Sequence, residues 1–204
     1  MIKSDFIMKH TQVYLDPRNR LHYSAFYVQG LWDIYGRTHV HYSIKPFLTL
    51  ERKETKSFDH YMAFVICNES ETIRVIIDFR DMIDFEQDVY DWSDVYAKIN
   101  ISKSLNINHY PKLLSIPPGF GIRIYNWPEV IFYCVVNFFK CRRRRLTSLM
   151  GHLFDYYSNY YYGYSWFHIS GGTRSSLSNC GAILCISYYI PYCVQFLLFM
   201  GNQK

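Results

Sequence analysis

The order of elements in the opening segment constrains the fold more than any other feature of the sequence. Residues 11–15 have the composition of a short strand, and Asp16-Pro17-Arg18-Asn19 has the residue types of a tight turn or helix cap. Apolar side chains then recur at helical spacing over residues 20–35, and Gly36 follows where a helix commonly ends. Residues 39–44 alternate with a period of two. A strand, a helix and a second strand in this order form the repeating unit of a parallel α/β sheet.

The next segments continue the sheet. Residues 61–67 and 72–79 are rich in β-branched and aromatic residues and are separated by four polar residues, which predicts a hairpin. Residues 94–101 alternate again, and residues 112–116 predict a further short strand. We therefore expect the α/β fold class over residues 1–171: a Rossmann-like, three-layer domain with a central, mostly parallel sheet.

An apolar helix is predicted over residues 128–140, where Pro128 and Glu129 suit the first turn. Because it is apolar almost all round, this helix is expected to be buried in protein or to lie in lipid. Its length of about 20 Å is too short to cross a bilayer core. The helical pattern continues over residues 146–157.

Composition excludes several classes of protein. The chain has 204 residues, of which 50% are hydrophobic and only 19% charged, so it can bury a core and is not intrinsically disordered. The net charge of +5 is small and dispersed, and no nucleic-acid-binding signature is present, so no nucleic acid partner is expected. The six Cys residues include no C-x-x-C pair, which favours free thiols in a reducing cytoplasm over a zinc site or a disulfide framework.

The usual sequence marks of catalysis are absent. The chain contains no G-x-S-x-G, P-loop, G-x-G-x-x-G or H-E-x-x-H motif, so no catalytic residue and no cofactor is assigned. His39 and His41 would share one face of a strand, but no third ligand is spaced to join them. We therefore interpret both histidines as structural and expect no metal site.

Residues 172–204 differ from the rest of the chain. They contain two charged residues, Arg174 and Lys204, and the run from Cys180 to Met200 has none. Three interpretations stay open: a membrane anchor, a buried element of a larger fold, or a non-native end caused by truncation or a frame shift. The abrupt loss of acidic residues favours the third.

Four consecutive arginines follow the apolar helix directly. Arg142, Arg143, Arg144 and Arg145 form a cluster of the kind that anionic lipid head groups attract. The helix beside them could lie in the membrane interface. The alternatives are a solvated linker after a core helix and a nucleic-acid patch. The cluster therefore predicts contact with an anionic membrane surface as one of three interpretations.

The segment from Pro117 to Arg123 contains two glycines and a cation after a predicted strand. Glycine lets the backbone approach a ligand closely, and arginine binds anionic or hydroxylated groups. In open α/β sheets the ligand crevice lies outside the carboxyl ends of the strands. The same edge should receive residues 16–19, 45–46, 78–81 and 102–103. A simple turn is the alternative interpretation.

The order of the later features resembles the N-terminal half of bacterial GT-B glycosyltransferases that build lipopolysaccharide or capsule. The residues that carry the resemblance are Asp94-Val-Tyr-Ala-Lys-Ile-Asn100 and then Pro111-Lys-Leu-Leu-Ser-Ile-Pro-Pro-Gly-Phe-Gly121. In such enzymes a Tyr-x-Lys-x-Asn-like strand is followed by a short strand and a Pro-Gly loop. The resemblance covers roughly residues 10–165.

The resemblance implies an acceptor-binding domain. GT-B enzymes have two Rossmann-like domains, of which the N-terminal one usually binds the acceptor and the C-terminal one the nucleotide-sugar. It implies a glycan or a lipid-linked sugar as partner, a cytoplasmic location, peripheral at the inner membrane, and no activity without the nucleotide-sugar-binding domain. The candidate acceptor-binding residues are Arg18, Lys98, Asn100, Gly119 and Arg123. The alternative function is a membrane-surface-associated binding or scaffold protein that uses the polybasic patch.

Overall fold

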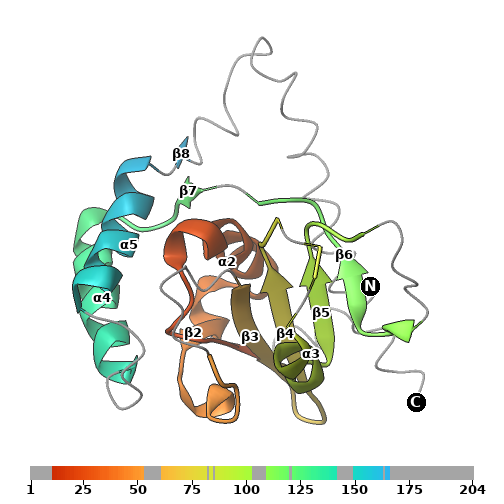
Figure 1. Cartoon of the computed structure of the whole chain (residues 1–204). Helices are drawn as coiled ribbons and strands as arrows, with labels where there is room; N and C mark the ends of the chain where they lie inside the picture. The colour runs from red at the N-terminus through yellow and green to blue at the C-terminus, as the bar shows by residue number, and fades with distance from the viewer. Residues whose placement is uncertain are drawn as a thin grey trace.

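The computed structural model describes residues 11–52, 61–81, 83–84, 86–102, 109–119, 121–141, 149–162 and 164–165. A six-stranded sheet lies at their centre, and a separate pair of short strands lies above it in the view of Figure 1. The expected domain boundary, the tail 172–204 and Arg142–Arg145 lie outside the described residues.

Six strands make up the large sheet: β1 (Gln12–Leu15), β2 (Val40–Tyr42), β3 (Tyr61–Cys67), β4 (Thr72–Asp78), β5 (Val95–Lys98) and β6 (Leu113–Ser115). The α-helices are α2 (Leu21–Tyr35), α3 (Gln87–Trp92), α4 (Trp127–Cys141) and α5 (Leu149–Tyr162). Two short 3-10 helices are η1 (Arg37–His39) and η2 (Lys45–Phe47). The small sheet pairs β7 (Ile122–Arg123) with β8 (Tyr164–Ser165).

The strand order in the large sheet is β2-β1-β3-β4-β5-β6. β1 is parallel to β2, and β4, β5 and β6 are parallel to one another, whereas β3 is antiparallel to both β1 and β4. Five strands therefore run in one direction and β3 runs in the other. The α/β, Rossmann-like fold with a mostly parallel sheet is confirmed.

The opening unit forms as the sequence predicts. α2 connects the parallel strands β1 and β2, which pair with Val13 opposite Val40. The helix ends at Gly36, whose φ of 81° is a left-handed conformation that glycine adopts without steric cost, and whose N–H donates to the carbonyl of Trp32 at 2.9 Å. Leu21, Ala25, Val28 and Leu31 are buried at the spacing of one helix face, and Phe26 and Tyr27 are buried beside that face.

The predicted hairpin is also present, and it explains why its first arm has no polar alternation. β3 and β4 pair from Tyr61 opposite Asp78 to Cys67 opposite Thr72. Alternate side chains of β3 enter two different apolar cores, with Phe64 in one and Val65 in the other. A strand covered on both faces must be apolar at every position.

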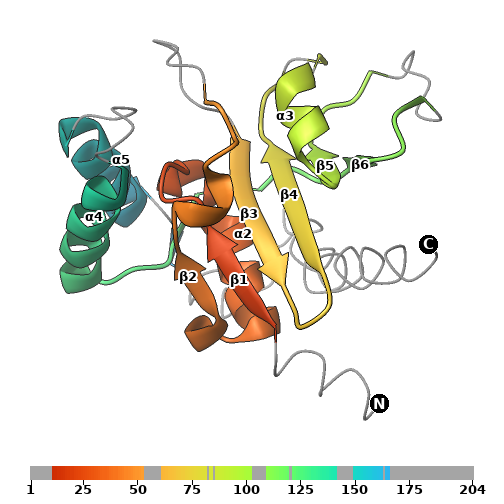
Figure 2. The ribbon, with the colours of Figure 1, turned by 90° about the horizontal axis from the view of Figure 1, so that it is seen from below.

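Two apolar cores, one on each face of the sheet, separate the three layers of the domain. One lies between the sheet and α2, α4 and α5, and the other lies between the sheet and the segment of η2 and α3. Figure 2 shows α4 and α5 beside the β2 edge and α3 near β4 and β5. Helices on both faces are the arrangement expected for a doubly wound sheet.

The apolar helix predicted over residues 128–140 is α4, and only one of its faces is buried. The buried positions are Val130, Cys134, Asn137 and Cys141. On the other side, large apolar residues are exposed: Ile131, Phe132, Val135 and Phe139. α4 packs against α5, where Nδ2 of Asn137 donates to the hydroxyl of Tyr156 at 2.6 Å. Within the described residues, every helix is too short or too polar to cross a lipid bilayer.

Candidate functional site

The strand order places a topological switch point between β1 and β4. From β1 the chain continues through α2 to β2 on one side, and from β4 it continues through α3 to β5 and β6 on the other. In open α/β sheets, ligands bind at such a point, outside the carboxyl ends of the strands. The carboxyl ends of β1 and β4 flank the amino end of β3 here, because β3 runs in the opposite direction.

The turn after β1 is held by a buried ion pair. Arg18 donates to Asp16 through its backbone N–H at 2.9 Å, and its guanidinium donates to both carboxylate oxygens at 2.8 to 3.0 Å. The same guanidinium donates to the carbonyls of Phe47 and Leu50. An ion pair in which several guanidinium N–H groups donate to one carboxylate is strong and has a specific geometry.

Arg52 and Asn19 connect this turn to β3. The guanidinium of Arg52 pairs with Asp16 at 3.2 Å and donates to the side-chain oxygen of Asn19 at 2.6 Å. Asn19 in turn donates to the carbonyl of Ala63 and accepts from its N–H. The Arg52 guanidinium also lies over the Tyr61 ring, 4.4 Å from its centroid. These contacts fix the turn against the first residues of β3.

A second turn of the same design follows β4. Arg80 donates to Asp78 through its backbone N–H at 2.9 Å and through Nε and Nη2 at 2.9 to 3.2 Å. The hydroxyl of Tyr96 and the ammonium of Lys98 donate to the same carboxylate at 2.7 and 3.1 Å. Burial alone would raise the pKa of Asp78, but the hydrogen bonds from Arg80 and Tyr96 outweigh it and lower that pKa.

The structure places two of the predicted acceptor-binding residues inside these turns. Arg18 and Lys98 are buried, and the bonds just described engage their charged groups. In this structure both charged groups help to fix the carboxyl edge.

The other three predicted residues lie in separate surroundings. Asn100 is exposed after β5 and donates to the carbonyl of Asp81. Gly119 lies against α2, where an added Cβ would come within 2.8 Å of the Tyr27 ring. Arg123 is exposed on β7, and its guanidinium lies 5.0 Å from the centre of the Tyr160 ring. Asn100 is thus at the carboxyl edge with Lys98, whereas Arg123 belongs to the smaller sheet.

An aromatic cluster that the sequence analysis missed lies at the same edge. The ring of Phe79 stacks on the rings of Tyr27 and Tyr23, at 5.6 and 6.5 Å between centroids. Tyr23 is 44% exposed, and the hydroxyl of Tyr27 donates to the carbonyl of Pro117. Two sequence features could have revealed this cluster. Tyr23 and Tyr27 have helical spacing, and Phe79 lies between Asp78 and Arg80, which form the second ion-paired turn.

His22, in the first turn of α2, belongs to this edge as well. Burial lowers the pKa of its imidazole, so the ring is mainly neutral at pH 7. Its Nδ1 is buried without a hydrogen-bond partner among the described residues. An added Cβ at Gly121 would meet this ring at 3.0 Å, so the loop after β6 packs on it closely.

The remaining candidate ligands are held by other contacts. The side-chain amide of Gln12 bonds to His39 at 3.0 Å and to His41 at 3.1 Å. In the described part of the chain, no group of three or more His, Cys, Asp or Glu side chains could hold a metal ion. Burial raises the pKa of the Cys141 thiol to about 12, so it is protonated at neutral pH.

Comparison with protein families, with curated proteins and with solved structures finds no match to this chain. The fold defines the class of protein: an α/β domain with a Rossmann-like sheet and a candidate ligand edge at its switch point.

Proposed function

We propose that this domain binds a glycan or lipid-linked sugar acceptor, as the N-terminal domain of a GT-B glycosyltransferase does. The observation that carries the proposal is the aromatic cluster at the carboxyl end of β4, where the exposed ring of Tyr23 stacks on the partly buried ring of Phe79. Ligand sites combine aromatic surface with a few fixed polar groups. Asn100 supplies an exposed amide after β5, where it donates to the carbonyl of Asp81 in the loop that follows β4.

The ion-paired turns support the same proposal. A binding site needs side chains whose positions are fixed by their neighbours. The Asp16–Arg18 and Asp78–Arg80 pairs hold the ends of β1 and β4 on either side of β3. Phe79 lies between Asp78 and Arg80 in the second turn, and its ring packs against the ring of Tyr27.

A glycan array probed with the full chain tests acceptor binding. We expect a set of glycans to bind and the Tyr23→Ala variant to lose at least tenfold in affinity for them, because the stacking surface is removed. Tyr161→Ala is the matched control, since Tyr161 is a helical tyrosine on α5 that is 58% exposed. Absence of glycan binding, or equal losses in both variants, would contradict the proposal.

Sugar transfer is expected to require a second domain. In GT-B enzymes the nucleotide-sugar binds on a separate Rossmann-like domain, and the described residues form one such sheet. We therefore expect the 204-residue chain to bind acceptors without transferring sugar to them. Turnover with a nucleotide-sugar and a bound acceptor would contradict this part of the proposal.

A second candidate function, association with an anionic membrane surface, is favoured by the exposed side of α4. Phe132 and Phe139 are each 59% exposed, and Ile131 and Val135 lie on the same side. Arg142 to Arg145 follow this helix directly in the sequence. Apolar side chains next to a polybasic segment are the combination that binds peripheral proteins to anionic lipid.

Cosedimentation with vesicles tests this second candidate. We expect binding to phosphatidylserine-containing vesicles, and less binding for Phe132→Ser/Phe139→Ser and for the variant with alanine at positions 142–145. Ile83→Ser is the control, because Ile83 is similarly exposed but lies after β4. Equal binding to neutral vesicles, or no loss in either variant, would contradict the membrane function.

A further inference from the structure

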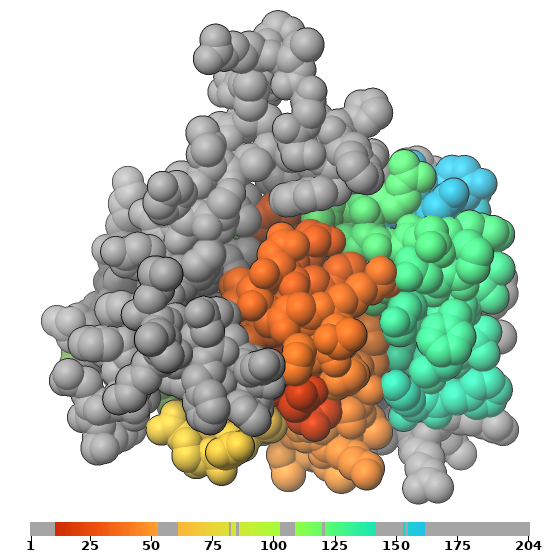
Figure 3. All heavy atoms as spheres, turned by 180° about the vertical axis from the view of Figure 1, so that it is seen from behind, coloured from red at the N-terminus to blue at the C-terminus, as the bar shows by residue number. Residues whose placement is uncertain are grey.

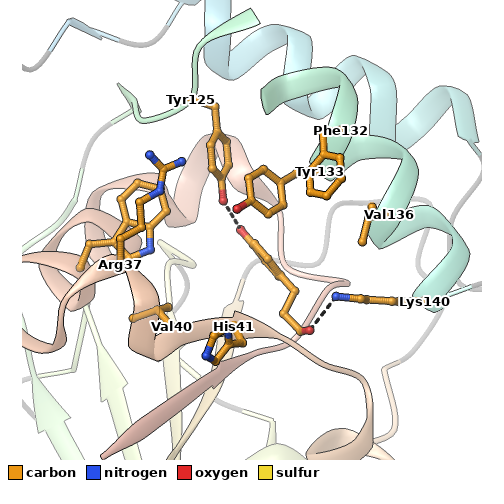
Figure 4. A pocket seen from close by; sticks show the side chains of 10 residues that line it. Arg37, Val40, His41, Tyr125, Phe132, Tyr133, Val136 and Lys140 are labelled. Carbon is orange, nitrogen blue, oxygen red and sulfur yellow. Dashed lines mark hydrogen bonds between the residues drawn. The ribbon is translucent and has the colours of Figure 1, made fainter. Parts of the chain in front are cut away.

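A pocket of roughly 250 Å³ lies outside the sheet, between the edge strand β2 and α4. Its walls come from the end of α2, from η1 and β2, and from α4 with the residue Tyr125 before it (Figure 4). Figure 3 shows the orange segment that contains β2 beside the green helix α4 on one face of the molecule. The volume is below the range of about 300–1,000 Å³ for drug-sized ligands, so a single ring is the appropriate occupant.

Aromatic rings form the body of the pocket. Tyr133 stacks on Tyr125 at 4.6 Å between centroids and lies 5.8 Å from Tyr42. The hydroxyl of Tyr125 donates to that of Tyr42 at 3.2 Å, so two phenolic oxygens lie in one wall. Trp32 and Phe132 complete the lining. Rings with hydroxyl groups suit a ligand that has both an apolar face and hydroxyl groups.

Arg37 supplies one cation at the pocket. Its guanidinium lies over Trp32, 4.5 Å from the ring centre, and donates to Glu129. The Arg37 side chain is nevertheless 46% exposed, so an anion can approach it. The other carboxylate oxygen of Glu129 accepts from the backbone of Asn126, which holds this carboxylate beside α4.

Lys140 supplies a second cation on the α4 side. Its ammonium donates to the carbonyl of Tyr42 at 2.8 Å, as Figure 4 shows. An ammonium has three N–H donors, and this bond uses one of them. Burial lowers the pKa of Lys140, and a bound anion would counteract that effect. The described residues that line the pocket include both cations and no carboxylate.

We propose that this pocket binds one sugar unit that carries an anionic group, with the ring against Tyr133 and Tyr42 and the carboxylate or phosphate at Lys140, while Arg37 lies on the opposite side of the pocket (Figure 4). The sugar identity of the ligand rests on the proposed acceptor function, whereas the preference for an anion rests on the two cations alone. The pocket lies at the β2 edge of the sheet and is therefore a site additional to the aromatic cluster at Tyr23.

Titration calorimetry with the full chain tests the pocket. The probes are glucuronic acid, glucose 6-phosphate, glucose and inorganic phosphate. We expect the two acidic sugars to bind at least tenfold more tightly than glucose or phosphate, because only they engage both the aromatic rings and the ammonium of Lys140. Glucose binding as tightly as the acids, or phosphate alone binding as tightly, would overturn the proposal.

Variants distinguish this pocket from the carboxyl edge. Lys140→Gln should weaken acidic-sugar binding about tenfold, and Arg37→Gln should weaken it by a smaller factor, because Arg37 lies on the opposite side of the pocket. The matched control is Arg74→Gln, because Arg74 also forms an exposed ion pair, with Asp94, and lies over a tryptophan, Trp92. Equal losses of acidic-sugar affinity in Lys140→Gln and Arg74→Gln would overturn the proposed pocket. Failure of Tyr23→Ala to affect glycan binding would instead count against the proposed function and leave the anion preference in place.

Discussion

Lys98 donates to Asp78 at 3.1 Å, and their side chains are 1% and 0% exposed. The pair lies where the parallel strands β4 and β5 end side by side. Taking two charges out of water is costly, and the network compensates for that cost because Arg80 and Tyr96 also donate to the carboxylate. Lys98, for which the sequence suggests contact with a ligand, is thus part of the framework that fixes the site.

Replacing Asp78 by Asn should therefore destabilise the domain strongly. The change removes the carboxylate that Lys98 and Arg80 share, and it leaves a buried ammonium without its partner. Breaking a buried pair in this way typically costs about 3–5 kcal/mol in the free energy of unfolding. Urea denaturation monitored by circular dichroism measures the change.

The exposed pair of Arg74 and Asp94 provides the control for this experiment. Both side chains are well exposed, so Asp94→Asn should lower the free energy of unfolding by less than about 1 kcal/mol. If the two Asp→Asn variants lose similar stability, the buried pair does not have the structural role assigned to it.

Asp155 should make the stability of the domain depend on pH in a narrow range. It lies on α5 and accepts hydrogen bonds from the backbone N–H groups of Leu21 and His22 at the start of α2. Burial raises its pKa from 3.8 to about 6. The folded state therefore binds this proton more tightly than the unfolded state does, and stability from this group is lost as the pH rises from about 4 to about 6.

The expected loss is about 3 kcal/mol, at about 1.36 kcal/mol per pKa unit. Asp155→Asn cannot ionise, so its stability should not show this dependence. Chemical denaturation of both proteins at pH 4, 5, 6 and 7 makes the comparison. Parallel pH profiles for the two proteins would show that Asp155 does not titrate in this range.

Gly119→Ala should lower stability because of close packing against α2. The new Cβ would lie 2.8 Å from a ring carbon of Tyr27 and 3.1 Å from one of Phe26. Both rings are largely buried, so the loop or the helix must shift, at a cost of about 1–3 kcal/mol. Thermal unfolding measures the effect. An unchanged melting temperature would mean that the loop can shift without cost. Gly119 would then be needed only to let a ligand approach the backbone.

The local patterns of the sequence predict most of the fold. The helix cap at Gly36, the β3–β4 hairpin and the parallel pairing of β1 with β2 all follow from residue spacing and turn chemistry. β7 and β8 were not predicted, because a two-residue strand has no period to detect. The predicted strands over residues 39–44 and 94–101 are also longer than β2 and β5, since neighbouring turns take up their ends.

The candidate site was harder to predict because it depends on contacts between side chains whose partners the sequence does not reveal. A sequence shows that Arg18 and Lys98 are cations near strand ends, but it does not show that Asp16 and Asp78 bury them. The same limit applies to the pocket beside β2. There Lys140 meets the carbonyl of Tyr42, a contact between residues 98 positions apart.

Chemical-shift mapping of a bound glycan on the isotope-labelled full chain tests the central proposal most directly. We expect a glycan selected from the array to perturb the signals of Tyr23, Phe79 and Asn100 at the carboxyl edge. Perturbations confined to the exposed tyrosines of α5, with no change at the carboxyl edge, would contradict the assignment of this edge as the acceptor site.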